Sequence, residues 1–441
     1  MSVIREPETN FPYTLECWPL RDSVDSAGTV DERAKSWMLA VARGFHESDI
    51  AEENQPTFVG TAAADGQRAY AAYAEQIRQG SLPRREPVAT YASSDGTINV
   101  GAGLLPVDMI TAVTVRPSHR RRGLLSAMIT ADLADAKQRG VPLAALTASE
   151  ASIYGRFGFG EATRSRFVTV DTSLGFALRT APTGEVELAP TSSAGAVQAE
   201  LFEAFHATTY GSILRPDHYR LLVAGEGSFD HPEPDRKVRV AVHYASDGQI
   251  DGYVSYKHLG YQHKPLTLEI IDLLALNSNS YLALWQFLGG VDLSMAVEWP
   301  GAPVSDPLLW ALVDSRRYKV TREVDSLWLR PLDVPALLNA RKYWADGEIT
   351  LRVLDSLGCT PGVFTLKVQG GQPSTISHGE DDGPVDLELD VAALGSLYLA
   401  GVSARTLHQA GRLPAETAES ALELFDDLFR SPVPPVTRTA F

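Results

Sequence analysis

The chain has 441 residues, of which 44% are hydrophobic and 21% are charged, an ordinary balance for a globular protein. Its formal net charge of −16 argues against a nucleic-acid partner, because phosphate contacts need a basic surface, and it favours a cationic substrate. Cys17 and Cys359 have no metal-type spacing, and neither a signal peptide nor a membrane-spanning stretch is evident. We therefore expect a cytoplasmic protein with no metal centre and no membrane partner, although secretion by another route stays open.

The first segment, residues 1–180, has the pattern of a mixed α/β domain. Apolar residues at helical spacing predict helices over residues 36–46 and 124–139, and Gly140 closes the second one. Alternating and β-branched runs predict strands, two of which are joined by a turn at residues 94–96. The predicted strands cover residues 86–91, 97–105, 109–115 and 141–147.

The second segment, residues 181–333, repeats this order of predicted elements, which indicates a degenerate internal duplication. After Leu276 the chain continues Asn-Ser-Asn-Ser-Tyr, with no counterpart of the arginines and the glycine at residues 120–123. If that first loop holds a cofactor, the second segment has lost it. The predicted elements are strands over 239–243, 253–257 and 266–276, a helix over 281–288, a strand over 295–298, a helix over 308–313 and a closing strand over 325–329.

The third segment, residues 334–441, combines helices and strands and ends in a tail. The tail, residues 431–441, contains three prolines and cannot form a regular helix, so on its own it would be expected to be disordered. A loop rich in Gly, Ser and Asp is expected over residues 370–384. The predicted elements are a helix over 334–344, strands over 349–354, 362–368 and 385–389, and helices over 392–400 and 416–428.

The most informative stretch is a short basic turn between a predicted strand and the helix that begins at residue 124. Free N–H groups at a helix N-terminus point at an anion, and the helix dipole favours negative charge there. Arg120, Arg121 and Arg122 add positive charge, and Gly123 lets the backbone approach a ligand closely. The pattern predicts a diphosphate site, with a chance basic surface turn as the alternative.

In its context this turn resembles the acetyl-CoA motif of the Gcn5-related (GNAT) N-acetyltransferases. Arg120-x-x-Gly123 follows a Val-x-Val strand end and precedes a helix, although Leu125 stands where that family has Gly or Ala. The resemblance implies that acetyl-CoA is bound by the strand end, by the loop and by the end of the next strand. The residues concerned are Val113, Thr114, Val115, Arg120, Arg121, Arg122, Gly123, Leu124, Leu125, Ser126, Ser149 and Glu150.

A second motif, Tyr-Gly-Arg-Phe-Gly-Phe-Gly over residues 154–160, resembles the GNAT sequence around the thiolate leaving group. A tyrosine is ordinarily neutral at pH 7 and can donate a proton, so Tyr154 is the expected general acid. The alternative is that these aromatic residues belong to the core, and we prefer that interpretation for Phe157 and Phe159.

Several motifs together resemble the Eis (enhanced intracellular survival) family. They are His119-Arg-Arg-Arg-Gly-Leu-Leu, Ile153-Tyr-Gly-Arg-Phe-Gly-Phe-Gly, Leu327-Trp-Leu-Arg, Leu394-Gly-Ser-Leu-Tyr-Leu and the last residue, Phe441. The resemblance implies mixed α/β sheets arranged as two tandem GNAT-like domains followed by a sterol-carrier-protein-like α+β domain. Residues 1–180 would be catalytic, residues 181–333 would lack a cofactor site, and residues 334–441 would present the C-terminal carboxylate.

The same resemblance implies a homohexamer that acetylates aminoglycosides at several amines, an activity that confers antibiotic resistance. It assigns the C-terminal carboxylate of Phe441 as general base and an acidic residue after the first helix, here Glu47, to the substrate ammonium groups. The residue before the last is acidic in the family and is Ala440 here, which bears on affinity and on which amines react. Protein lysines or polyamines are alternative acceptors, and a lipid-binding protein is the non-enzymatic alternative.

Overall fold

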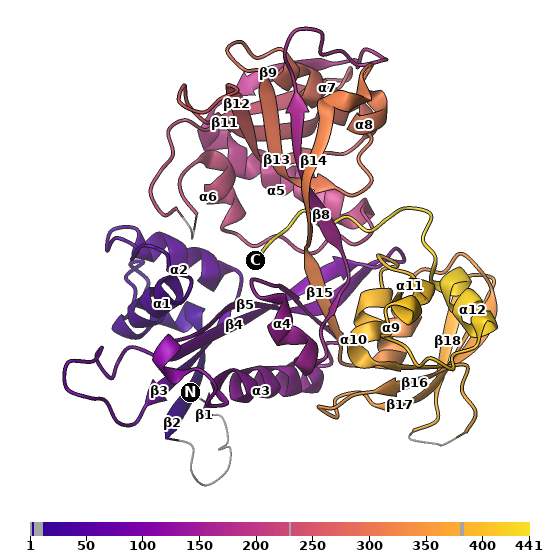
Figure 1. Ribbon diagram of the computed structural model, residues 1–441. Helices are drawn as coiled ribbons and strands as arrows, with labels where there is room; N and C mark the ends of the chain where they lie inside the picture. The colour runs from indigo at the N-terminus through magenta and orange to yellow at the C-terminus, as the bar shows by residue number, and fades with distance from the viewer. Residues whose placement is uncertain (1, 4–11, 229–230, 380–382) are drawn as a thin grey trace. The chain divides into compact units, whose positions relative to one another are not determined.

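The computed structural model describes residues 2–3, 12–228, 231–379 and 383–441 (Figure 1). The chain forms two compact units. The first comprises Met1–Ala162, Leu327–Pro432 and Ala440–Phe441, and the second comprises Thr163–Ser326 and Val433–Thr439. No helix within the described residues is long and apolar enough to cross a membrane.

The first unit contains an eight-stranded sheet in which every neighbouring pair is antiparallel except β5 and β6. In sheet order its strands are β1 (Ser2–Val3), β2 (Tyr13–Pro19), β3 (Arg68–Ala74), β4 (Ala89–Asn99), β5 (Leu104–Val115), β6 (Leu143–Thr147), β15 (Leu327–Pro331) and β7 (Gly160–Glu161). Its helices are α1 (Glu32–Gly44), α2 (Gln55–Ala64), α3 (Leu124–Gln138) and α4 (Ala151–Tyr154), with short 3₁₀ turns at Leu20–Ser23, Pro117–His119 and Gly155–Phe157.

The parallel pair β5 and β6 separates partway along its length. Only Asp108, Met109 and Ile110 of β5 pair with β6. Ala112 then adopts a positive φ of 54°, and the register between β4 and β5 shifts at this point, as in a β-bulge. The edge of β5 from residue 111 to residue 115 is therefore not paired with β6, which leaves backbone groups available to an extended ligand.

Helix α3 packs its apolar face on this sheet. Leu124, Met128, Ile129 and Leu133 are buried in one cluster with Tyr91 and other residues of the strands. The same face carries the buried Asp132, whose carboxylate accepts hydrogen bonds from Tyr70, Tyr91 and Ser93 at 2.8, 2.6 and 2.6 Å. Both oxygens of that buried carboxylate thereby accept at least one hydrogen bond, and these bonds fix α3 against the sheet.

The hairpin between β4 and β5 corrects the sequence prediction. Residues 94–96, expected to form a turn, lie inside β4, where Asp95 forms an ion pair of 3.2 Å with Arg68 on β3. The turn lies further on, at Gly101 and Gly103, whose φ angles are 86° and 154°. Glycine adopts such angles without strain, and this is the physical reason that the chain reverses there.

A four-stranded sheet, in the order β18-β17-β16-β19, forms the rest of the first unit. The predicted loop over residues 370–384 is wrong in part, because it contains β18, and the helix predicted over 334–344 ends at Ala340. The strands are β16 (Gly347–Leu354), β17 (Gly362–Gln369), β18 (Gln372–Ser377) and β19 (Leu387–Asp390), and the helices are α9 (Val334–Ala340), α10 (Val391–Leu397), α11 (Ala404–Gln409) and α12 (Glu419–Phe429).

The second unit contains a seven-stranded sheet in the order β14-β8-β13-β12-β11-β10-β9, in which only β12 and β13 are parallel. Helix α7 connects that parallel pair as α3 connects β5 and β6, which is the repeat expected from the sequence. The strands are β8 (Arg164–Asp171), β9 (Glu185–Ala189), β10 (Arg239–Tyr244), β11 (Ile250–His258), β12 (Thr267–Ala275), β13 (Ala296–Pro303) and β14 (Tyr318–Asp325), and the helices are α5 (Thr191–Thr208), α6 (Tyr219–Ala224), α7 (Ser278–Gly289) and α8 (Leu308–Ala311).

One strand of the first sheet comes from beyond the second unit in the chain. The predicted closing strand over residues 325–329 is wrong in its placement, because β14 ends at Asp325 and β15 lies between β6 and β7 of the first sheet. Leu327 and Leu329 are fully buried, and their apolar pattern suits either sheet. The contiguous domain ranges 1–180, 181–333 and 334–441 stay predictions, and the two compact units divide the chain differently.

Candidate active site

The loop between β5 and α3 presents a helix N-terminus that no side chain caps within the described structure. Gly123 is the N-cap of α3 and has a left-handed φ of 78°. A Cβ at this position would meet no protein atom within 4 Å, so the glycine is required by its backbone conformation rather than by crowding. Since the first N–H groups of a helix lack intrahelical partners, this end of α3 can bind an anion.

The three arginines of the loop differ in their contacts. Arg122 donates from Nη1 to the Tyr13 hydroxyl at 2.9 Å and from Nη2 to the Ser118 carbonyl at 3.1 Å, so it holds the loop against β2. Arg120 and Arg121 are exposed, and neither guanidinium has a hydrogen bond or ion pair among the residues that the structure describes. These two charges are therefore available to a phosphate, a distinction that the sequence analysis did not make.

The end of β5 offers its backbone rather than its side chains. The Thr114 hydroxyl lies 2.7 Å from the Thr90 hydroxyl, and a Cβ on Gly44 of α1 would lie 2.3 Å from the Thr114 side chain. Thr114 is thereby packed between β4 and α1, while Val113 and Val115 are half-buried. The strand edge beyond Ile110 is not paired with β6, so its backbone groups are available to an extended ligand, and the assignment of these residues to acetyl-CoA stays a prediction.

The first turn of α3 completes this half of the site. Leu124 is buried and Leu125 packs against the same core, so each can offer only its backbone to a ligand. Ser126 is exposed on the first turn. The departure from the family pattern at Leu125 is thus accommodated by the core, and the loop fits a diphosphate.

Strand β6 leads to the predicted general acid. Ser149 and Glu150 are exposed after the strand, and Glu150 is the N-cap of α4, which ends at Tyr154. Tyr154 is 4% exposed and packs edge-to-face on Phe159 with ring centroids 6.2 Å apart. Burial, with a smaller contribution from the Glu150 carboxylate, raises the pKa of Tyr154 to about 12. The phenol therefore stays protonated at neutral pH, and Phe157 and Phe159 are core residues, as expected.

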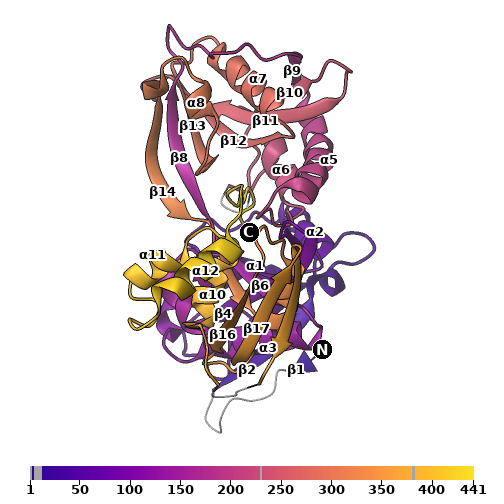
Figure 2. The same ribbon diagram turned by 90° about the vertical axis from the view of Figure 1, so that its right-hand side faces the viewer.

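The last residue of the sequence lies at the end of the same strand. The Thr147 hydroxyl donates a hydrogen bond to the backbone oxygen of Phe441 at 2.6 Å, and the Phe441 N–H donates to that hydroxyl at 3.4 Å. Both ribbon views place the C-terminus beside the first sheet (Figures 1 and 2). Sequence reasoning missed Thr147, for which the only signal was its place two residues before Ser149.

The segment before the last two residues is ordered within the second unit. Thr437 and Thr439 are buried, and their hydroxyls donate to the carbonyls of Gly211 and Ile213 at 2.9 and 3.2 Å. Arg438 lies 4.3 Å from the ring centroid of Trp299. The tail is not disordered, because side chains supply the hydrogen bonds that a proline-rich backbone cannot make with itself.

The predicted substrate carboxylate, Glu47, lies just after α1. Its N–H donates to the Ala42 carbonyl at 2.9 Å, and the preceding residue, His46, has a positive φ of 64°. Within the described part of the chain, no hydrogen bond or ion pair joins Glu47 to Tyr154 or Phe441. Its carboxylate is half-exposed and free to meet a cation.

The corresponding helix in the second unit is capped by the protein itself. Asn277 is the N-cap of α7 and accepts a hydrogen bond from the Ser280 N–H at 3.0 Å. Its side-chain amide donates to Asp251 at 2.7 Å, and Asp251 also lies 2.5 Å from the His243 imidazole. These groups stand where an anion would have to bind, which supports the expected loss of the cofactor site.

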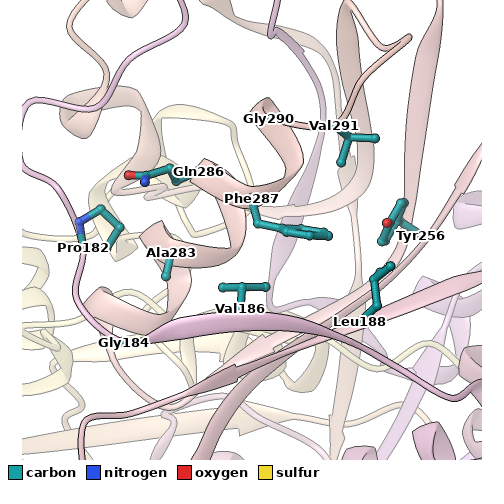
Figure 3. A pocket seen from close by; sticks show the side chains of 10 residues that line it. All are labelled: Pro182, Gly184, Val186, Leu188, Tyr256, Ala283, Gln286, Phe287, Gly290 and Val291. Atoms are coloured by element: carbon teal, nitrogen blue, oxygen red, sulfur yellow. The ribbon is translucent and has the colours of Figure 1, made fainter.

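The second unit also has an open pocket of about 500 Å³ between α7, β9 and β11 (Figure 3). No lining residue is charged, so the pocket suits neither a diphosphate nor an ammonium group. It therefore does not compete with the loop of the first unit as the active site. Its lining consists of Pro182, Gly184, Val186, Leu188, Tyr256, Ala283, Gln286, Phe287, Gly290 and Val291.

Comparison with known families agrees with this geometry. Two family models described as acetyltransferase (GNAT) domains match residues 33–162 and 211–331. A model described as a sterol carrier protein domain matches residues 334–438. The predicted fold class, with two GNAT domains and a sterol-carrier-like domain, is confirmed.

Relatives match nearly the whole chain. An uncharacterized N-acetyltransferase of Streptomyces griseus is 32% identical over 421 residues, which cover 93% of this chain and 97% of that protein. The N-acetyltransferase Eis of Mycobacterium tuberculosis is 34% identical over 376 residues, covering 83% of this chain and 88% of its own. The crystal structure of Eis1 from Mycobacterium abscessus has a TM-score of 0.73 and 27% identity, and covers 92% of this chain and 97% of its own.

A protein with this fold and this loop is a GNAT-type enzyme that uses acetyl-CoA as its cosubstrate. The general activity predicted from the sequence, N-acetyl transfer, is thereby confirmed. The chain belongs to the Eis family of N-acetyltransferases.

Proposed function

We propose that the enzyme acetylates amines of aminoglycosides, at several positions, with Tyr154 as general acid and the C-terminal carboxylate of Phe441 as general base. The observation that carries this proposal is the placement of Phe441 on Thr147, at the end of the strand that leads to Tyr154. The net charge of −16 and the free carboxylate of Glu47 favour a polycationic acceptor.

The chemistry then divides between two groups at the C-terminal end of β6. Acetyl-CoA supplies the acetyl group as a thioester, held by the loop at residues 120–126 and by the edge of β5. The Phe441 carboxylate accepts the proton of the attacking amine as the amide bond forms. Tyr154 donates its hydroxyl proton to the departing thiolate as the carbon–sulfur bond breaks, so that a neutral thiol leaves.

The acceptor is tested by measuring thiol release from acetyl-CoA with kanamycin-type and tobramycin-type aminoglycosides. We expect release well above the hydrolysis background and products with more than one acetyl group by mass spectrometry. Release no higher than background with every aminoglycoside would remove the acceptor assignment and leave the enzyme class intact.

Ala440 favours a second candidate, a polyamine or a protein lysine as acceptor, because the family's acidic residue at this position is missing. The chemistry at Tyr154 and Phe441 would be the same. A panel of spermidine and lysine peptides in the same assay separates the two, since kcat/KM ranks the acceptors directly.

Assembly as a homohexamer is likewise proposed from the family resemblance, and light scattering of the purified chain measures it.

The general base is tested by adding one glycine after Phe441, which replaces the carboxylate with a peptide bond and keeps the ring. General base catalysis contributes roughly 10²–10⁴-fold, so turnover should fall by at least about 100-fold. The dissociation constant for acetyl-CoA, measured by calorimetry, should stay the same because the loop is untouched. An extended protein with full turnover would show that Phe441 is not the base.

A further inference from the structure

Thr147 lies at the point where β5 and β6 separate. The last parallel pair between these strands is Ile110 with Leu146, so Thr147 is the first residue of β6 beyond it. On its other side Thr147 is paired with Leu327 of β15. The sheet therefore fixes the backbone of Thr147 from one side, while its side chain is only half-buried.

The hydroxyl of Thr147 makes two contacts with the last residue, and they differ in direction. It donates its one proton to the Phe441 oxygen at 2.6 Å, a distance typical of a hydroxyl bound to a charged carboxylate. It also faces the Phe441 N–H, at 3.4 Å. A hydroxyl has a single proton, so it can hold one carboxylate oxygen and leaves the second without a bond from this residue.

We propose that Thr147 is a positioning residue that holds one oxygen of the Phe441 carboxylate and so directs the other toward the attacking amine. The inference rests on the proposed function, because it gives a partner to the proposed base. Fixing the base matters, since proton transfer needs the carboxylate within hydrogen-bond reach of the amine in the reacting complex.

Substitutions of Thr147 distinguish the contribution of its hydroxyl from the contribution of its β-branched shape to the strand. Thr147→Val keeps the β-branched shape that strands favour and removes the donor. Loss of a hydrogen bond to a charged group should lower kcat by about 10-fold or more, with the KM for acetyl-CoA unchanged. Thr147→Ser keeps the hydroxyl and should restore kcat to within about 3-fold of the wild type. Thr147→Ala, which adds no apolar group, should show the same loss as Thr147→Val.

Thr350→Val is the matched control. Thr350 is a half-buried strand residue of β16 whose hydroxyl lies 2.9 Å from that of Thr365. Among the residues that the structure describes, no hydrogen bond or ion pair joins it to the proposed active site. The control should retain wild-type kcat. Equal activity in Thr147→Val, Thr147→Ala and the wild type would overturn the role of Thr147.

Combining Thr147→Val with the glycine extension distinguishes this inference from the proposed base. If Thr147 acts through the carboxylate, the substitution should cause no further loss in the extended protein. A full, additive loss would mean that Thr147 acts by another route, and would overturn the inference. If the extended protein is impaired but Thr147→Val is fully active, the inferred role of Thr147 is wrong and the proposed role of Phe441 as base is retained. If the extended protein is fully active, the assignment of the Phe441 carboxylate as general base is wrong.

Discussion

At the scale of single residues, the proposed general acid, Tyr154, occupies a core position. Its ring packs on Phe159, and its pKa is raised to about 12 by burial and by the nearby Glu150. A general acid has to be protonated before it acts, so the raised pKa keeps the active form populated up to strongly alkaline pH. Burial disfavours the phenolate and thus keeps Tyr154 in the protonated form that the proposed role requires.

Tyr154→Phe keeps the ring and its packing and removes the proton donor. We expect turnover to fall by about 100-fold, with little change in the KM for acetyl-CoA. In the wild type, kcat should show no decline due to this phenol below about pH 10, because the rate decreases only as pH approaches the raised pKa of about 12. Stopped-time thiol assays over a pH series measure both effects.

Tyr261→Phe is the control for that substitution, because the Tyr261 side chain is largely exposed on the second unit. It should leave turnover unchanged. A Tyr154→Phe enzyme as fast as this control would show that another group, or water, protonates the thiolate.

Sequence reasoning reached some of these residues and not others, for a physical reason. Tyr154 and Gly123 occur in local motifs, in which the neighbouring residues already imply the turn or the helix around them. Thr147 contacts Phe441, which is 294 positions away along the chain. No local pattern records such a contact, and the hydroxyl of a strand threonine has no special sequence context.

At the scale of elements, the tail at Val433–Thr439 is held by side chains buried in the second unit. Arg438 donates to the Gly301 carbonyl at 2.9 Å and covers Trp299, while its own carbonyl accepts from Arg215 at 3.1 Å. Arg215 in turn forms a two-point ion pair with Asp272, at 2.7 and 3.1 Å. A buried guanidinium with these partners anchors the tail by more than one interaction.

Arg438→Ala should loosen the tail, because it removes the contact with Trp299 and the bond to Gly301. We expect faster hydrogen exchange over residues 433–441 and a turnover reduced by about 10-fold, with acetyl-CoA affinity unchanged. Mass spectrometry of exchanged peptides and calorimetry measure these changes.

Arg430→Ala is the control, since Arg430 follows α12 and is exposed. This variant should show the same hydrogen exchange over residues 433–441 and the same turnover as the wild type. An Arg438→Ala protein with unchanged exchange in the tail would show that the tail is held without this anchor.

The element predictions failed where a pattern allowed two placements. Residues 94–96 have turn-forming composition, but the cross-strand ion pair of Asp95 keeps them in β4. The strand at residues 327–331 was recognised as apolar, but its alternation does not say which of two sheets it joins. By contrast, α3 was predicted to within one residue, because its apolar face and Gly140 mark both the helix and its end.

At the scale of the whole molecule, the two GNAT domains have the same fold and different helix ends. In the first, Gly123 leaves the N-terminus of α3 open beside exposed arginines. In the second, Asn277 caps α7 and is itself bonded to Asp251. The cap already satisfies one of the N–H groups that an anion would need, and the Asn277 side chain occupies that end of the helix.

One molecule of acetyl-CoA should therefore bind to each chain. Isothermal titration should give a stoichiometry near one, and Arg120→Glu should abolish binding at that site by reversing the charge at the loop. A stoichiometry near two would contradict the assignment of the second domain as cofactor-free. Residual binding in Arg120→Glu at full affinity would show that the loop at residues 120–123 is not the site.

The place of β15 also bears on how the protein is made. The first sheet needs residues 327–331 between β6 and β7, yet these residues follow the whole of the segment Thr163–Ser326. During synthesis, β6 and β7 therefore lack their shared neighbour, β15, until the second domain has been synthesised. An unpaired, apolar strand edge favours association with other chains, so we expect the emerging N-terminal domain to be most prone to aggregation before β15 is made.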